Sequence, residues 1–158
     1  MRRITFQGYT FTLYPLDAKR NVPVMAIPGK PLHRFGSGPF CEFSLPQGVD
    51  KCKYKRGLYI FVVNGEVRYL GRCLTTYKQR LSEYGRILPS DRCKKNGQPT
   101  NCHINSELNA AFNAESYVEI GICPLDFEGV DGDAIIEAAE QIVLDKMRKD
   151  NPYWNLRY

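Results

Sequence analysis

The segment 57–71 constrains the fold more than any other part of the sequence. Two runs rich in β-branched and aromatic residues, 57–63 and 66–71, flank the dipeptide Asn64-Gly65. An Asn-Gly pair between two such runs is the strongest short-range signal for a β-hairpin, because both residues accept the positive φ angles of a tight hairpin turn. A hairpin is therefore expected here.

Other elements follow from periodicity and from helix caps. Apolar residues alternate between residues 4 and 13, with an interruption at Gln7-Gly8, which predicts a strand pair or one bent strand. Five prolines between residues 22 and 56 predict mostly loop. Further along, the sequence predicts a helix opened by Thr75 or Thr76 and closed by Gly85, a helix over 104–113, a strand over 117–123 and a helix over about 133–149.

The order hairpin, helix, helix, strand, helix predicts an α+β (mixed α/β) fold. We expect a small, mainly antiparallel three-stranded sheet flanked by helices, with an N-terminal β/loop elaboration. Residues 1–55 are interpreted as this β-rich and loop extension, and residues 56–158 as the main domain.

Composition narrows the class of protein. A chain of 158 residues with 43% apolar residues has room for one or two domains with a substantial core. The net charge of +5 is a mild indication of an anionic partner such as nucleic acid. Because the sequence contains neither a stretch long enough for a membrane span nor an apolar leader, we expect no membrane partner and a soluble, unexported protein of the cytoplasm or nucleoid.

The six cysteines include no CxxC pair, so buried thiols are the default interpretation. A zinc site built from Cys93, Cys102 and His103 is the alternative.

Two charged residues occupy apolar helix faces. Arg80 lies on the stripe formed by Tyr77, Leu81 and Tyr84, where it is either a snorkelling side chain or a clamp for an anion. Glu140 lies at the edge of the apolar face of the last helix. A carboxylate there is costly unless it is paired or binds a cation, so it is either a salt-bridge partner, for which Arg80 is a candidate, or a metal ligand.

The hairpin also carries a more specific pattern. Gly57-Leu58-Tyr59 and, after nine residues, Tyr69-Leu70-Gly71 resemble the signature of the GIY-YIG nuclease superfamily, with leucine replacing isoleucine in both triplets. The resemblance covers about residues 56–158. Further positions match the family's motif in order: Arg80, one residue later than in the family's spacing, Tyr84, His103, Glu140 and Asn155. Arg72 departs from the lysine that family members often carry after the last glycine, and His103 could equally be a helix cap.

The resemblance implies a divalent-metal-dependent endonuclease that hydrolyses phosphodiester bonds of DNA. In this interpretation Tyr59 is the general base or orients the water, in one hydrogen-bond network with Tyr69 and His103. Arg80 clamps a phosphate oxygen, and Glu140 binds the metal, one Mg²⁺ or Mn²⁺ per active site. Tyrosine is a poor base at its reference pKa of about 10, so nearby arginines and the cation would have to stabilise the phenolate. The predicted catalytic residues are Tyr59, Tyr69, Arg72, Arg80, Tyr84, His103, Glu140 and Asn155.

A shared site requires both tyrosines on one face of the hairpin. With a two-residue turn at Asn64-Gly65, Tyr59 would lie opposite Leu70 and the tyrosines would point to opposite faces. A three-residue loop, 63–65, with a G1 bulge at its glycine would place Tyr59 opposite Tyr69. We therefore predict this bulged loop.

Two basic clusters are expected to contact DNA phosphates, which set affinity and salt dependence rather than sequence preference. An ordinary solvated charge run is the alternative for each. The predicted contacts are Lys51, Lys53, Lys55 and Arg56 before the hairpin, and Arg86, Arg92, Lys94 and Lys95 in the central loop.

The short chain, in which no zinc finger is evident, favours a small restriction-type or mobile-element nuclease. Residues 1–55 would then carry recognition, and symmetric cutting would favour a homodimer on DNA. The alternatives are a structure-specific DNA repair nuclease, a non-catalytic nucleic-acid-binding protein on the same fold, and a zinc-bound structural module.

Overall fold

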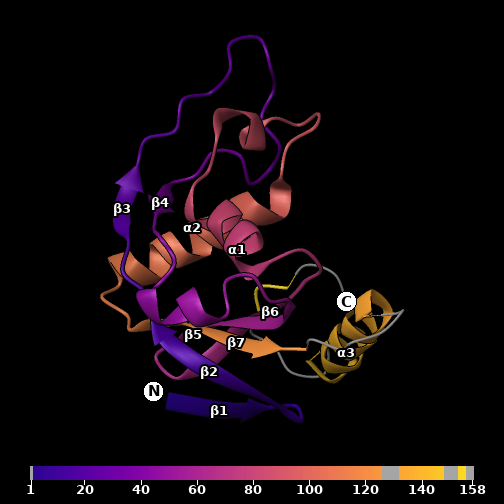
Figure 1. Cartoon of the computed structure of the whole chain (residues 1–158). Helices are drawn as coiled ribbons and strands as arrows, with labels where there is room; N and C mark the ends of the chain where they lie inside the picture. Colours follow the sequence, from indigo (N-terminus) through magenta and orange to yellow (C-terminus); the bar gives the residue numbers. More distant parts are fainter. Residues whose placement is uncertain (1, 126–131, 148–152, 156–158) are drawn as a thin grey trace. The chain divides into compact units, whose positions relative to one another are not determined.

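The structure is a computed structural model that describes residues 2–125, 132–147 and 153–155 (Figure 1). Its elements in chain order are β1 (Arg2–Phe6), β2 (Tyr9–Pro15), β3 (Lys19–Val22), β4 (Phe40–Glu42), the 3₁₀ helix η1 (Gln47–Lys51), β5 (Gly57–Val63), β6 (Glu66–Cys73), α1 (Tyr77–Gly85), the 3₁₀ helix η2 (Pro89–Arg92), α2 (Pro99–Asn113), β7 (Val118–Pro124) and α3 (Gly132–Met147). No helix within the described ranges is long and apolar enough to cross a membrane.

The chain forms two compact units that alternate along the sequence. The first unit comprises Met1–Leu16, Pro46–Arg80 and Tyr117–Tyr158, and the second comprises Asp17–Leu45 and Leu81–Ser116. The boundary falls within α1, so Arg80 belongs to the first unit and Tyr84 to the second. The expected extension of residues 1–55 is divided between both units.

The first unit contains a five-stranded antiparallel sheet in the order β1-β2-β7-β5-β6, and the second unit contains a two-stranded sheet, β3-β4. The α+β class agrees with the prediction, but the predicted three-stranded sheet is wrong. The N-terminal strands form the expected strand pair across Gln7-Gly8, whose φ angles are 51° and 89°. Strand β2 then pairs with β7, from Thr12 opposite Ile122 to Pro15 opposite Glu119, which extends the sheet by two strands. This long-range pairing has no local signal in the sequence.

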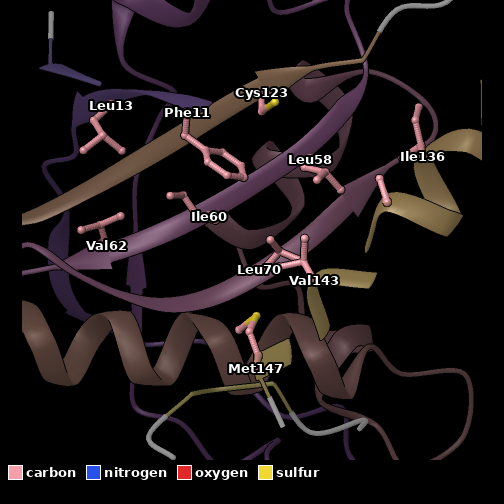
Figure 2. Close-up of a cluster of buried hydrophobic side chains, with 11 residues drawn as sticks. Phe11, Leu13, Leu58, Ile60, Val62, Leu70, Cys123, Ile136, Val143 and Met147 are labelled. Atoms are coloured by element: carbon pink, nitrogen blue, oxygen red, sulfur yellow. The ribbon is translucent and has the colours of Figure 1, made fainter. Parts of the chain in front are cut away.

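The core of the first unit lies between the sheet and α3, which packs on β5 and β6. Figure 2 shows Leu58, Ile60 and Val62 on the same sheet face as Ile136 and Val143 of α3. Because side chains alternate along a strand, Tyr59 and Phe61 lie on the opposite face. Not every apolar residue of α3 is buried, since Ile135 and Ile142 are exposed by 42% and 51%. The predicted end of this helix, 148–149, lies outside the described residues.

The second unit is organised by asparagines of α2. Asn105 Oδ1 accepts the Cys41 N–H at 2.8 Å, and Asn105 Nδ2 donates to the Cys41 carbonyl at 2.9 Å, so one buried side chain binds β4 through both backbone groups. One turn later, Asn109 Oδ1 accepts the Asn21 N–H at 2.9 Å and binds β3. The helix begins at Pro99 rather than at residue 104, because proline is well suited to a first helical position.

Helix α1 begins where the sequence predicts, since Thr76 Oγ1 accepts the Gln79 N–H at 3.1 Å. The helix ends at Gly85, which the sequence predicts to close it, and this glycine also has a packing role. The Gly85 carbonyl accepts the Phe43 N–H at 3.0 Å, and a Cβ atom on Gly85 would lie 2.3 Å from the Phe43 carbonyl oxygen. Glycine is needed here for close backbone approach.

Candidate active site

The turn of the β5–β6 hairpin has two residues, so the predicted three-residue loop is wrong. Val63 pairs with Glu66 across Asn64-Gly65, whose φ angles of 49° and 82° are those of a type I′ turn. Such a turn, continued in register, would place the signature tyrosines on opposite faces.

A β-bulge further along the hairpin restores the common face. Val62 pairs with Val67, but Phe61 pairs with Tyr69, so Arg68 is an extra residue in β6. The shift by one residue places Tyr69 on the face of Phe61 and Tyr59. The Tyr59 and Tyr69 ring centroids lie 6.2 Å apart. The prediction that both tyrosines share a face is confirmed, although the bulge lies in β6 and Tyr59 pairs with Gly71 rather than with Tyr69.

Both glycines of the signature have a steric explanation. A Cβ atom on Gly71 would lie 2.4 Å from Cζ and the hydroxyl oxygen of Tyr59, so the tyrosine side chain extends across β6 only because this residue is glycine. Gly57 has a φ of 153°, and a Cβ there would lie 2.4 Å from the Cys123 carbonyl oxygen and 2.7 Å from the Tyr77 hydroxyl. The Tyr77 hydroxyl donates to the Leu58 carbonyl at 2.8 Å. Both glycines are thus required by the way β5, β6 and α1 pack together, because each makes room for a tyrosine side chain.

The two tyrosines are largely covered. Tyr59 is 1% and Tyr69 is 8% exposed. Arg72 lies on the other face, because it follows Leu70 by two residues and Leu70 belongs to the core beneath α3.

Glu140 of α3 forms an ion pair with Arg72 of β6. The distance between Arg72 Nη1 and Glu140 Oε1 is 3.4 Å, and the Glu140 side chain is only 16% exposed. Burial raises the pKa of Glu140 above its usual value of 4.5, and Glu137 adds to this shift, while Arg72 and Arg80 oppose it. Arg80 is therefore close enough to act on this carboxylate. Of the two interpretations of Glu140, a salt-bridge partner is observed, and that partner is Arg72.

A metal ion at Glu140 would depend on a single protein carboxylate. Among the described residues, no group of three or more histidine, cysteine, aspartate and glutamate side chains is placed to hold a metal. Mg²⁺ is commonly bound through one or two carboxylates, with phosphate and water oxygens completing its shell. The mostly buried carboxyl group of Glu140 fits this minimal type of site, in which the substrate supplies most ligands.

Asn155 is bound to the backbone of β6. Its Oδ1 accepts the Leu70 N–H at 3.2 Å, and its Nδ2 donates to the Leu70 carbonyl at 2.7 Å. Next to it, the Trp154 N–H donates to the Arg68 carbonyl at 2.6 Å. Since β6 is the outer strand of the sheet, this segment satisfies backbone groups that have no strand partner.

Tyr84 and His103 belong to the second unit. Tyr84 is fully buried, and its carbonyl accepts Asn105 Nδ2 at 2.7 Å. His103 lies within the first turns of α2, and its ring centroid is 4.5 Å from that of Phe35. Within the first unit, the structure groups Arg72 with Glu140 on the face that packs under α3, and Tyr59 with Tyr69 on the opposite face. Tyr84 and His103 are described only within the second unit.

The basic residues expected at DNA differ in their surroundings. Arg92 is buried, donates from Nε to the Gly36 carbonyl at 2.6 Å and from Nη1 to the Val24 carbonyl, and thereby supports a loop instead of facing solvent. Arg56 binds the Leu74 carbonyl and Asp133. Exposed or partly exposed side chains belong to Lys51, Lys53, Lys55, Arg56, Arg86, Lys94 and Lys95.

Sequence reasoning missed the bulge residue Arg68. The two conflicting signals, an Asn-Gly turn and two tyrosines required on one face, together imply one extra residue somewhere in a strand. The guanidinium of Arg68 lies 5.7 Å from the Trp154 ring centroid, and its buried Nε has no hydrogen-bond partner among the residues that the structure describes.

The cysteines form no disulfide, and all six lie in the described residues. Burial raises the pKa of Cys102 to about 12, and its Sγ donates to the Asp91 carbonyl at 3.5 Å. Cys93 Sγ donates to the Pro89 carbonyl at 3.6 Å. These contacts are those of protonated, packed thiols.

Comparisons of the chain with models of protein families, with curated proteins and with solved structures found no match. The resemblance to the GIY-YIG nucleases therefore depends on residues of the sequence alone.

Proposed function

We propose that this protein is a divalent-metal-dependent DNA endonuclease of the GIY-YIG kind. The observation that carries the proposal is the charge cluster at Glu140. A mostly buried carboxylate on α3 is paired with Arg72 of β6 and lies in the field of Arg80 of α1. Three elements far apart in sequence thus contribute the groups that phosphodiester hydrolysis requires, namely cations for phosphate oxygens and a hard oxygen ligand for Mg²⁺.

Each residue has a chemical task in this proposal. Arg80 and Arg72 bind non-bridging oxygens of the scissile phosphate and stabilise the charge of the transition state. Glu140 would exchange its contact with Arg72 for Mg²⁺ or Mn²⁺, which when bound polarises the phosphate and stabilises the leaving oxygen. The Tyr59 hydroxyl, which extends across β6 over Gly71, orients or deprotonates the attacking water, and Tyr69 supports it from the same face. Because Arg72 and Glu140 lie on the other face of the sheet, this task requires the scissile phosphate to bind at the outer edge of β6.

The biological setting we favour is a small restriction-type or mobile-element nuclease acting on DNA, with a homodimer for symmetric cutting. A structure-specific repair nuclease uses the same chemistry and differs only in the substrate.

Burial of the tyrosines favours a second candidate function, a nucleic-acid-binding protein without catalysis. With Tyr59 1% exposed, a water molecule reaches its hydroxyl only if the neighbouring side chains rearrange when DNA binds. A protein that kept the hairpin for its packing alone would show the same burial.

Cleavage of supercoiled plasmid and of branched DNA in Mg²⁺, Mn²⁺ or EDTA tests the proposal. We expect metal-dependent products. Tyr59→Phe should lower the rate by about 10²- to 10⁴-fold, and Glu140→Gln by at least about 100-fold. The matched controls are Tyr117→Phe, on an exposed ring, and Glu137→Gln, which removes an exposed carboxylate one turn before Glu140.

Cleavage that persists in EDTA, or a Glu140→Gln variant as active as Glu137→Gln, would refute the assigned chemistry. Salt-sensitive DNA binding without cleavage of any substrate would establish the second candidate function instead.

A further inference from the structure

An exposed aromatic ring stands among ammonium groups on the first unit. Tyr54 is 68% exposed, and the Nζ atoms of Lys53 and Lys78 lie 5.3 Å and 5.8 Å from its ring centroid. We call Tyr54, Lys53 and Lys78 the Tyr54 platform. An aromatic ring of this exposure has most of its apolar surface in water, and it is unusual for such a ring to be flanked by two cations rather than covered.

The backbone holds the platform rigidly on α1. The Tyr77 N–H donates to the Lys55 carbonyl at 2.9 Å, and the Lys78 N–H donates to the Lys53 carbonyl at 2.8 Å. The residues on both sides of Tyr54 are thus bound to the first turn of the helix that carries Arg80. Because the backbone that carries the ring is held in place before any ligand arrives, little backbone conformational entropy is lost when the ring is used for binding.

The surroundings of the ring are positively charged. Lys51 and Lys55 are exposed on the same segment. An acidic side chain nearby, that of Asp50, is 66% exposed and lies 3.9 Å from Lys53 Nζ, and an exposed pair at this distance contributes little. The two cation–π contacts are long and solvated, so each lysine can turn from the ring to a phosphate at small cost.

We propose that Tyr54 stacks on a DNA base that lies outside the duplex stack, while Lys53 and Lys78 neutralise the adjoining phosphates. Every base offers a π-face, and alternation of an aromatic ring with lysines is the arrangement by which proteins hold single strands. A protein partner would be expected to cover apolar surface, whereas the neighbours of Tyr54 are cations. The inference rests on the proposed function and refines its substrate to DNA with an unpaired or extruded nucleotide near the cut, within about the 10–12 Å width of helix α1 from Arg80.

The test measures binding in EDTA, so it does not depend on cleavage. Fluorescence anisotropy compares a labelled duplex, the same duplex with a three-nucleotide bubble, and the single strand as DNA or RNA. We expect Tyr54→Ala to weaken binding to bubble and single-stranded DNA by about 5- to 100-fold, Tyr54→Phe to bind as the wild type does, and intact duplex to change less than about twofold. Tyr117→Ala removes a ring that is 55% exposed elsewhere on the same unit and should change nothing.

Equal effects of Tyr54→Ala and Tyr117→Ala on bubble binding would overturn the platform. Tighter binding of RNA than of DNA would also overturn it. The same holds if the wild-type protein binds only the intact duplex and neither the bubble nor the single strand. These results are separable from those for the nuclease. Tyr54-dependent binding without cleavage in Mg²⁺ supports the platform and refutes the nuclease, whereas metal-dependent cleavage together with bubble binding unaffected by Tyr54→Ala leaves the nuclease and refutes the platform.

Discussion

Replacing Asn155 tests how the outer edge of the sheet is completed. The Asn155 amide bonds to both the N–H and the carbonyl of Leu70, in the way that a neighbouring strand would. Both residues are buried, with Asn155 6% and Leu70 1% exposed. In Asn155→Ala, two buried backbone groups lose their partners at once. In Asn155→Asp, the acceptor for the Leu70 N–H remains, but a carboxylate oxygen replaces the donor and faces the Leu70 carbonyl.

The expected loss follows from these contacts. An unsatisfied buried polar group costs about 1–3 kcal/mol, so Asn155→Ala should lower the free energy of unfolding by about 2–4 kcal/mol. For a chain of this size the Tm falls by roughly 4–16 °C. At neutral pH Asn155→Asp should be at least as destabilising, because burial and the facing carbonyl disfavour the charged carboxylate and raise its folded pKa above the unfolded value of about 3.9. Its deficit relative to the wild type should shrink as the pH falls through that raised pKa, where the protonated acid can again donate to the Leu70 carbonyl.

Urea unfolding at pH 7 and pH 4.5, together with amide hydrogen exchange, measures both effects. The Leu70 amide should exchange at least about tenfold faster in Asn155→Ala, whereas the Gly71 amide, which faces β5 in the alternating ladder, should keep its protection. If Asn155→Ala loses less than about 0.5 kcal/mol, or the Asn155→Asp deficit is the same at both pH values, the hydrogen-bond account of this edge is refuted.

Three other substitutions test contacts in both units. Gly71→Ala should destabilise the fold by about 1–3 kcal/mol by colliding with the Tyr59 ring, and a double-mutant cycle with Tyr59→Ala in urea unfolding should show coupling of at least about 0.5 kcal/mol; additive losses would contradict the clash. Asn105→Ala removes three hydrogen bonds to the backbone of β4 and α1 and should cost about 2–4 kcal/mol by the same assay, against less than about 1 kcal/mol for the exposed Asn113→Ala. Because burial raises the pKa of Glu140 in the folded state, the folded state binds the proton more tightly than the unfolded state does. The free energy of unfolding of the wild type should therefore fall as the pH rises from about 4.5 through the raised pKa, and Glu140→Gln should lack this fall. Parallel pH profiles of the two proteins would contradict this expectation.

Local patterns predicted many elements well. The strand pair at Gln7-Gly8, the β5–β6 hairpin, the Thr76 cap and the buried stripe of Tyr77, Leu81 and Tyr84 all appear as expected, because each depends on neighbours within a few residues. The five-stranded sheet was missed. Pairing of β2 with β7 joins segments about a hundred residues apart. Strands with similar apolar alternation do not specify which strand they pair with, so the sequence pattern could not predict this pairing.

In the candidate site, too, the sequence identifies individual residues, whereas their contacts are known only from the structure. Glu140 stands out in the sequence because a carboxylate at the edge of an apolar helix face needs a partner, but only the structure shows that its ion-pair partner is Arg72 and that Arg80 also acts on its charge. Asn155 was matched to a catalytic motif, and the structure assigns it two hydrogen bonds to an edge strand.

The sequence by itself determined that an Asn-Gly turn joins two strands and that both signature tyrosines must share a face if they act together. The tertiary structure decided how a two-residue turn and a common face for the tyrosines are both achieved, through one extra residue in β6 and a glycine beneath the Tyr59 ring. Turn type depends on the φ angles of two adjacent residues, which the sequence encodes locally. The position of a bulge depends on how the whole hairpin packs against β7, α1 and α3, and that balance is settled only when the strands and helices pack together.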